Sequence, residues 1–86
     1  MIVGSLIKSN HTKFNSIWKQ IEWDSEFSDY ILSGHISDST LVIYLCDMPD
    51  PSPKNRKGKK YYIIKVLCQN GKIGYSFKDY WCDIDS

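Results

Sequence analysis

The chain has 86 residues, a length that predicts one domain with a modest hydrophobic core. Its formal net charge is +1, from 11 basic and 10 acidic residues, and this balance excludes a strong overall field that would attract nucleic acid or an anionic membrane. No apolar run approaches the roughly 20 residues that a membrane span needs, and the N-terminal residues lack the basic segment of a signal peptide.

Cysteine usage points to a reducing compartment. The three cysteines, Cys46, Cys68 and Cys82, are odd in number and widely spaced. A disulfide scaffold of this size normally has an even and denser set. We therefore expect three reduced thiols, with Cys46 and Cys68 buried in strands, and a cytoplasmic protein.

The first half of the chain predicts strands on either side of a short helix. Residues 1–8 form an apolar stretch that Gly4 interrupts, as a bulge or bend in a strand would. Four large apolar residues then recur at helical spacing: Phe14, Ile17, Trp18 and Ile21. This spacing predicts a helix over about residues 12–23. The later apolar run of residues 40–46, TLVIYLC, is typical of a central strand.

Residues 49–60, PDPSPKNRKGKK, predict an exposed basic loop. They contain all three prolines and five cationic residues, with no large apolar residue. The loop joins the apolar run of residues 40–46 to a second run at residues 61–68, so we expect these two strands to pair antiparallel.

The strongest local signal is a hairpin at Asn70-Gly71. Both residues reach positive φ at low cost, and runs of β-branched and aromatic residues flank them. A two-residue turn here predicts three apolar cross-strand pairs: Cys68 with Ile73, Val66 with Tyr75, and Ile64 with Phe77. One face of the hairpin would then be a continuous core surface.

The order of these features resembles the small Src-homology-3-like barrels found among short bacteriophage and bacterial accessory proteins. The resemblance rests on five features: Val3-Gly4-Ser5-Leu6-Ile7, the break Ser33-Gly34 before a strand, Tyr62-Ile-Ile-Lys-Val66, Asn70-Gly71-Lys72-Ile73-Gly74-Tyr75, and a closing Asp79-Tyr80-Trp81. It implies a single domain over residues 1–86, mainly β, with an antiparallel barrel of about five strands and the one short helix. Ser5 stands where such barrels usually have Asp. The fold has many functions, so it implies binding without naming a partner.

The sequence favours a binding module over an enzyme. It has no nucleophile motif, no phosphate-binding loop and no close pair of metal ligands, so we expect no catalytic residues, no metal and no cofactor. Aromatic residues make up 14% of the chain, more than one small core obviously needs. The candidate anchors for a partner or host protein are Trp18, Trp23, Tyr30, Tyr80 and Trp81. We expect the protein to act as a monomer or a homodimer.

The alternative function is nucleic-acid binding by the basic loop. Clustered cationic side chains on a loop can contact phosphates without sequence preference. The residues that would do so are Lys54, Arg56, Lys57, Lys59 and Lys60. The near-neutral total charge argues against strong binding of this kind.

Overall fold

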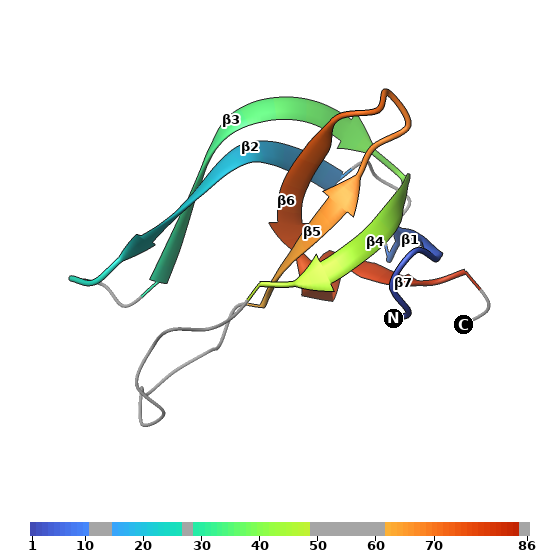
Figure 1. Cartoon of the computed structure of the whole chain (residues 1–86), viewed down its shortest axis with the longest axis horizontal. Coiled ribbons are helices and arrows are strands. Elements are labelled where there is room, and N and C mark those ends of the chain that lie inside the picture. The colour runs from blue at the N-terminus through green and yellow to red at the C-terminus, as the bar shows by residue number, and fades with distance from the viewer. Residues whose placement is uncertain (11–14, 27–28, 49–61, 85–86) are drawn as a thin grey trace.

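The computed structural model describes residues 1–10, 15–26, 29–48 and 62–84 (Figure 1). Within these ranges the chain forms seven strands and one short 3-10 helix. They are β1 (Leu6–Ser9), β2 (Asn15–Asp24), β3 (Asp29–Ser39), β4 (Leu41–Asp47), β5 (Ile63–Leu67), β6 (Ile73–Phe77), η1 (Lys78–Tyr80) and β7 (Trp81–Asp83).

The seven strands make one antiparallel sheet in the order β3-β2-β6-β5-β4-β1-β7. The mainly β class is therefore confirmed. The predicted barrel of about five strands is not confirmed, because the sheet has seven strands and ends in two edges, β3 and β7. The far halves of β2 and β3 reach away from the other strands (Figure 1).

A single core lies on the inner side of the curved sheet. Most of its side chains come from different strands, so long-range contacts hold the domain together: Ile7, Ile17, Val42, Tyr44, Ile64, Val66, Cys68 and Trp81. The run of residues 40–46 is confirmed as a strand that supplies two of these residues. Its partner is β5, as expected, although residues 49–60 between them lie outside the described residues.

The helix predicted over residues 12–23 is wrong, since most of this segment is β2. Asn15 and Ile17 are buried with the two-residue alternation of a strand. Pairing with β3 extends along all of β2, and a long cross-strand ladder outweighs local helix propensity. Ile17 and Trp18 would lie on one face of a helix, but as neighbours in a strand they lie on opposite faces. Phe14, the first residue of the predicted helical pattern, lies outside the described residues.

The predicted hairpin register is also wrong, by one residue. Val66 lies opposite Gly74 rather than Tyr75. The Cys68 N–H donates to the Lys72 carbonyl at 2.8 Å and the Gly71 N–H donates to the Cys68 carbonyl at 3.0 Å. This pattern is a three-residue loop in which Gly71 takes the positive φ of 83°.

The shift changes which β6 residues face the core. Gly74 and Ser76 are buried, whereas Ile73 is 50% exposed and both Tyr75 and Phe77 are only partly buried. The β5 half of the predicted face is confirmed, because Ile64, Val66 and Cys68 are all in the core.

Small residues on β6 have a steric reason. A Cβ atom added at Gly74 would lie 2.5 Å from Ile17 Cγ2, 2.8 Å from the Trp18 carbonyl oxygen and 2.9 Å from Ile36 Cδ1. Gly74 thus permits the close approach of β2 and β3 to β6, and this contact joins the two long strands to the rest of the sheet.

The thiols differ in exposure from the expectation. All three cysteines are free, and Cys68 is buried, but Cys46 is exposed near the end of β4 and Cys82 is partly buried. Burial raises the pKa of the Cys68 thiol. A register irregularity between β4 and β5 begins beside Cys46, and a strand bulge changes which way the following side chains point.

Candidate functional site

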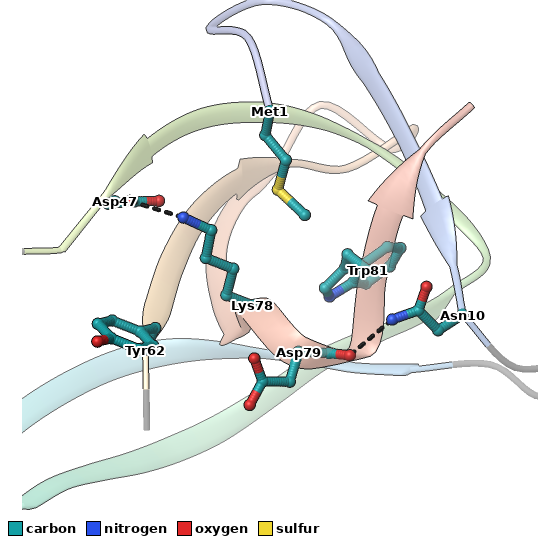
Figure 2. Close-up of a pocket in the computed structure, with 7 residues that line it drawn as sticks. All are labelled: Met1, Asn10, Asp47, Tyr62, Lys78, Asp79 and Trp81. Carbon is teal, nitrogen blue, oxygen red and sulfur yellow. Dashed lines mark hydrogen bonds and ion pairs between the residues drawn. The ribbon is translucent and has the colours of Figure 1, made fainter. Parts of the chain in front are cut away.

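A hollow lined in part by aromatic residues lies beside η1, and we call it the η1 pocket (Figure 2). Its volume is ≈ 490 Å³. Its walls come from the N-terminal segment, the ends of β1 and β4, the residue before β5, η1 and β7: Met1, Asn10, Asp47, Tyr62, Lys78, Asp79 and Trp81.

Charged and polar contacts fix one wall of the η1 pocket. Lys78 Nζ donates to Asp47 Oδ2 at 2.9 Å, and the Tyr44 hydroxyl donates to Asp47 Oδ1 at 2.7 Å. These bonds favour the carboxylate, so the hydrogen bond from Tyr44 and then that from Lys78 lower the pKa of Asp47. The hydrogen bond between Tyr44 and Asp47, together with desolvation, raises the pKa of Tyr44 to about 12.

Asn10 ties η1 to the end of β1. Its side-chain Nδ2 donates to the Asp79 carbonyl at 2.6 Å, and its backbone N–H donates to the Tyr80 carbonyl at 2.8 Å. Asn15 Nδ2 donates to the same Tyr80 carbonyl at 2.8 Å. The carbonyl groups of this short helix are therefore held in place, and the pocket wall is preorganised.

Two aromatic side chains line the pocket, Tyr62 and Trp81. Tyr62 is 48% exposed. Tyr80 is 45% exposed and lies in η1 between two lining residues, with its ring packed edge-on against Phe77 at a centroid distance of 5.7 Å. Trp81 is only 3% exposed, and its Nε1 donates to Ser76 Oγ at 2.9 Å. Trp81 therefore forms part of the core and of the pocket floor, and Tyr62 is a rim residue that the sequence prediction missed.

The other three predicted anchors lie elsewhere, on β2 and β3. Trp23 and Tyr30 pack edge to face with ring centroids 5.1 Å apart. Trp18 packs edge-on against His35 at 5.6 Å. The five predicted residues thus divide between two places, the η1 pocket and the β2–β3 pair.

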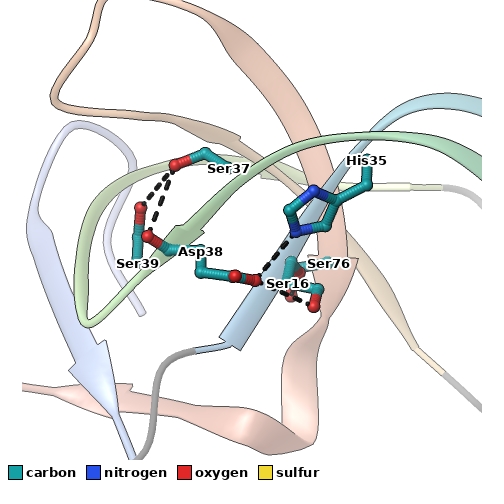
Figure 3. Close-up of polar contacts among 6 residues, drawn as sticks. All are labelled: Ser16, His35, Ser37, Asp38, Ser39 and Ser76. Carbon is teal, nitrogen blue, oxygen red and sulfur yellow. Dashed lines mark hydrogen bonds and ion pairs between the residues drawn. The ribbon is translucent and has the colours of Figure 1, made fainter.

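A polar cluster at the C-terminal end of β3 contains Ser, His and Asp side chains, but they are not arranged in the order of a catalytic triad (Figure 3). His35 Nε2 lies 2.8 Å from Asp38 Oδ1, and Ser16 Oγ donates to the same oxygen at 3.1 Å. These bonds lower the pKa of Asp38, first through His35 and then through Ser16. Activation of a serine requires the imidazole between hydroxyl and carboxylate, whereas here the carboxylate lies between them.

Two other classes of site can be compared with the described part of the chain. Among residues 1–10, 15–26, 29–48 and 62–84, no three His, Cys, Asp or Glu side chains gather as a metal site would require. No helix in the same ranges has the length and apolarity of a membrane span. The cationic residues proposed for nucleic acid, Lys54 to Lys60, lie outside the described residues.

Comparison with protein-family models, with curated proteins and with solved structures finds no match to this chain.

Proposed function

We propose that this protein is a non-catalytic binding module that holds an extended segment of a partner protein at the η1 pocket. The observation that supports this most directly is Tyr62, a half-exposed tyrosine that lines the η1 pocket; Tyr80, exposed to a similar degree, lies in η1 between the lining residues Asp79 and Trp81. Tyrosine offers a large apolar ring at low entropic cost together with a hydroxyl that can bond a peptide backbone.

The order of elements supports a Src-homology-3-like assignment within this proposal. Five strands lie side by side in the order β7-β1-β4-β5-β6, and η1 directly precedes β7 in the sequence. The β2–β3 pair occupies the place of the long first loop of such barrels. Barrels of that kind hold extended or proline-rich segments in aromatic grooves between loops.

The charges of the η1 pocket indicate which side chains the segment would contain. Asp47 is engaged by Lys78, whereas Asp79 is exposed on η1. An apolar residue of the partner would pack on the tyrosine rings, and a lysine or arginine beside it would approach Asp79. Charge at such a rim mainly changes the association rate, while aromatic burial supplies most of the affinity.

The proposal is tested by capturing partners on the immobilised protein from host lysate, with and without nuclease. We expect a protein that is retained after nuclease treatment. Tyr80→Ala and Tyr62→Ala should each weaken its binding by roughly 2 kcal/mol, the usual cost of truncating an aromatic anchor. Ile73→Ala is the matched control, because Ile73 is 50% exposed on β6 and does not line the η1 pocket.

Two outcomes would contradict this proposal in different ways. If both tyrosine variants retain the partner as well as Ile73→Ala does, the η1 pocket is not the binding site. If nuclease removes everything that the protein captures, the function itself is wrong and the basic loop becomes the leading explanation.

A further inference from the structure

The β2–β3 pair continues as a two-stranded ribbon beyond the point where β2 pairs with β6 (Figure 1). β2 pairs with β6 only at Trp18 opposite Tyr75, whereas its pairing with β3 continues to Asp24 opposite Asp29. We call residues 19–24 and 29–34 the β-ribbon. A two-stranded ribbon is at best marginally stable in water, and a third strand or a packed surface makes it stable.

The β-ribbon has one apolar and one polar face. Directly paired residues share a face; Ile21 lies opposite Leu32 and Trp23 lies opposite Tyr30. All four of these side chains are partly buried. The alternate pairs form the other face, where Gln20, Glu22, Ile31 and Ser33 are exposed.

Among the described strands, none pairs with the outer edge of the ribbon. β3 is the last strand in the sheet order, and β2 is its only partner among the described strands. Natural sheet edges are usually protected by lysine, proline or very short strands. β3 has 11 residues, DYILSGHISDS, with neither lysine nor proline; its register shift falls near Ile36, beyond the ribbon, and its one residue at positive φ, Gly34, ends the ribbon.

The charge of the segment defines what kind of strand would fit. Residues 19–34 contain four acidic residues and one lysine, a formal charge of −3, so the rest of the chain has +4 to give the total of +1. Two copies joined at this edge would bring two acidic segments together. A basic strand from another protein would be attracted instead.

We propose that the outer edge of β3 in the β-ribbon binds an extended segment of a partner protein in which basic and apolar residues alternate. The segment adds a third strand through backbone hydrogen bonds. Its apolar side chains extend the face of Ile21 and Trp23, and its basic side chains extend the face of Glu22. This surface is separate from the η1 pocket, and the inference does not depend on the function proposed there.

The test uses two synthetic eight-residue peptides, one alternating lysine with valine and the other alternating glutamate with valine. Each is titrated into the isotope-labelled protein while backbone amides are followed by NMR. We expect saturable binding of the lysine peptide only. Hydrogen exchange should slow at every second amide between Tyr30 and His35, because neighbouring strand amides point to opposite edges.

Variants separate the charge contribution from the backbone contribution. Glu22→Lys combined with Glu26→Lys alters two exposed side chains and should weaken binding about tenfold. Asp83→Lys reverses a charge on β7, at the opposite edge of the sheet and outside the η1 pocket, and should leave binding unchanged. The N–H groups of Ile31 and Leu32 point to opposite edges of β3. One of the variants Ile31→Pro and Leu32→Pro therefore removes an outward N–H group and keeps all hydrogen bonds to β2. That variant should fold and should lose the peptide.

Three results would overturn the inference. One is equal binding of both peptides, and another is a set of shifted amides confined to the η1 pocket. The third is a dimer of the free protein with β3 amides already slowed, which would make a second copy the occupant. If Tyr62→Ala and Tyr80→Ala do not weaken binding of a partner at the η1 pocket, the function proposed there is wrong but this inference still stands.

Discussion

At the scale of single residues, Gly74 limits what the core can accept. We expect Gly74→Ala to lower the free energy of unfolding by about 1–3 kcal/mol, the usual cost of overpacking. The added methyl would meet both side chains and the Trp18 carbonyl oxygen below 3.0 Å, and a backbone atom cannot rotate away. Chemical denaturation followed by tryptophan fluorescence measures the change.

Gly71→Ala is the informative comparison, because a Cβ at Gly71 has no neighbour within 4 Å. Its cost should come only from the positive φ of 83°, at about 1 kcal/mol. If Ile36→Val, which removes one of the three contacts, partly restores the stability of Gly74→Ala but not that of Gly71→Ala, the two causes are separated. Unchanged stability of Gly74→Ala would contradict the close approach of β2 to β6 at this position.

Asp47 should make stability depend on acid pH. Its pKa is lowered in the folded protein, chiefly by Tyr44, so its contribution is complete above the unfolded pKa of about 4 and disappears as pH falls through the lower folded value. The side chain is 47% exposed, so solvent screening limits the effect to about 0.5–1 kcal/mol. We expect Asp47→Asn to reduce the melting temperature at pH 7.

The difference between Asp47→Asn and the original protein should shrink as the carboxylate protonates below about pH 4. Tyr44→Phe keeps the ring and removes only the hydroxyl that donates to Asp47, and it should show the same convergence. A constant difference across this range would mean that the hydrogen bond does not favour the ionised carboxylate.

At the scale of elements, the hairpin shows how far local sequence reaches. Asn70-Gly71 correctly locates the turn, because few residues accept its backbone geometry. The same dipeptide fits a two-residue loop or a three-residue loop with Gly71 alone at positive φ, and the two choices reverse the faces of β6. The choice depends on Gly74 and Ser76 fitting against β2, a contact between residues about sixty positions apart in sequence.

The observed register predicts particular contacts that NMR can detect. Cross-strand NOEs should join Lys65 with Tyr75 and Val66 with Gly74. Asn70→Ala removes the acceptor of the 2.9 Å bond from the Lys72 N–H and should cost about 0.5–1 kcal/mol without changing these contacts. NOEs between Val66 and Tyr75 as direct partners would restore the two-residue turn.

β2 shows where local sequence misleads. Ile17, Trp18 and Ile21 satisfy a helical stripe and also a two-faced strand, and only the presence of β3 decides between them. β3 itself contains Gly34 at a φ of 73°, a residue and conformation that alone predict a break rather than a continuous strand.

At the scale of the whole molecule, the candidate sites were predictable by residue type but not by place. Aromatic excess drew attention to Tyr80, which is exposed in η1, and its role as an anchor stays a prediction. Trp81, its neighbour in sequence, turns into the core because Ser76 offers its indole N–H a buried acceptor. Tyr62 becomes a rim residue only when β5 and η1 meet, which is a property of the fold.

The two functions considered for the whole molecule differ in their response to salt. Binding of nucleic acid through the basic loop would release counterions, so the affinity would fall by roughly 10³-fold or more between 50 and 200 mM salt for several phosphate contacts. Lys57→Glu, Lys59→Glu and Lys60→Glu together would abolish it. Binding of a protein by apolar and aromatic contacts would change far less, and the triple variant would mainly slow association.

We expect the second behaviour. The total charge is +1, and the acidic residues 19–34 would be repelled by the same phosphates that the basic loop attracts. Fluorescence anisotropy with labelled single- and double-stranded oligonucleotides across this salt range gives the slope directly, with Trp23→Ala as a variant that leaves the loop charges intact. A steep slope that the triple variant removes and Trp23→Ala does not would reverse the order of the two functions. Weak oligonucleotide binding with a slope unaffected by the triple variant would leave the basic loop as a means of speeding encounter with an acidic protein surface.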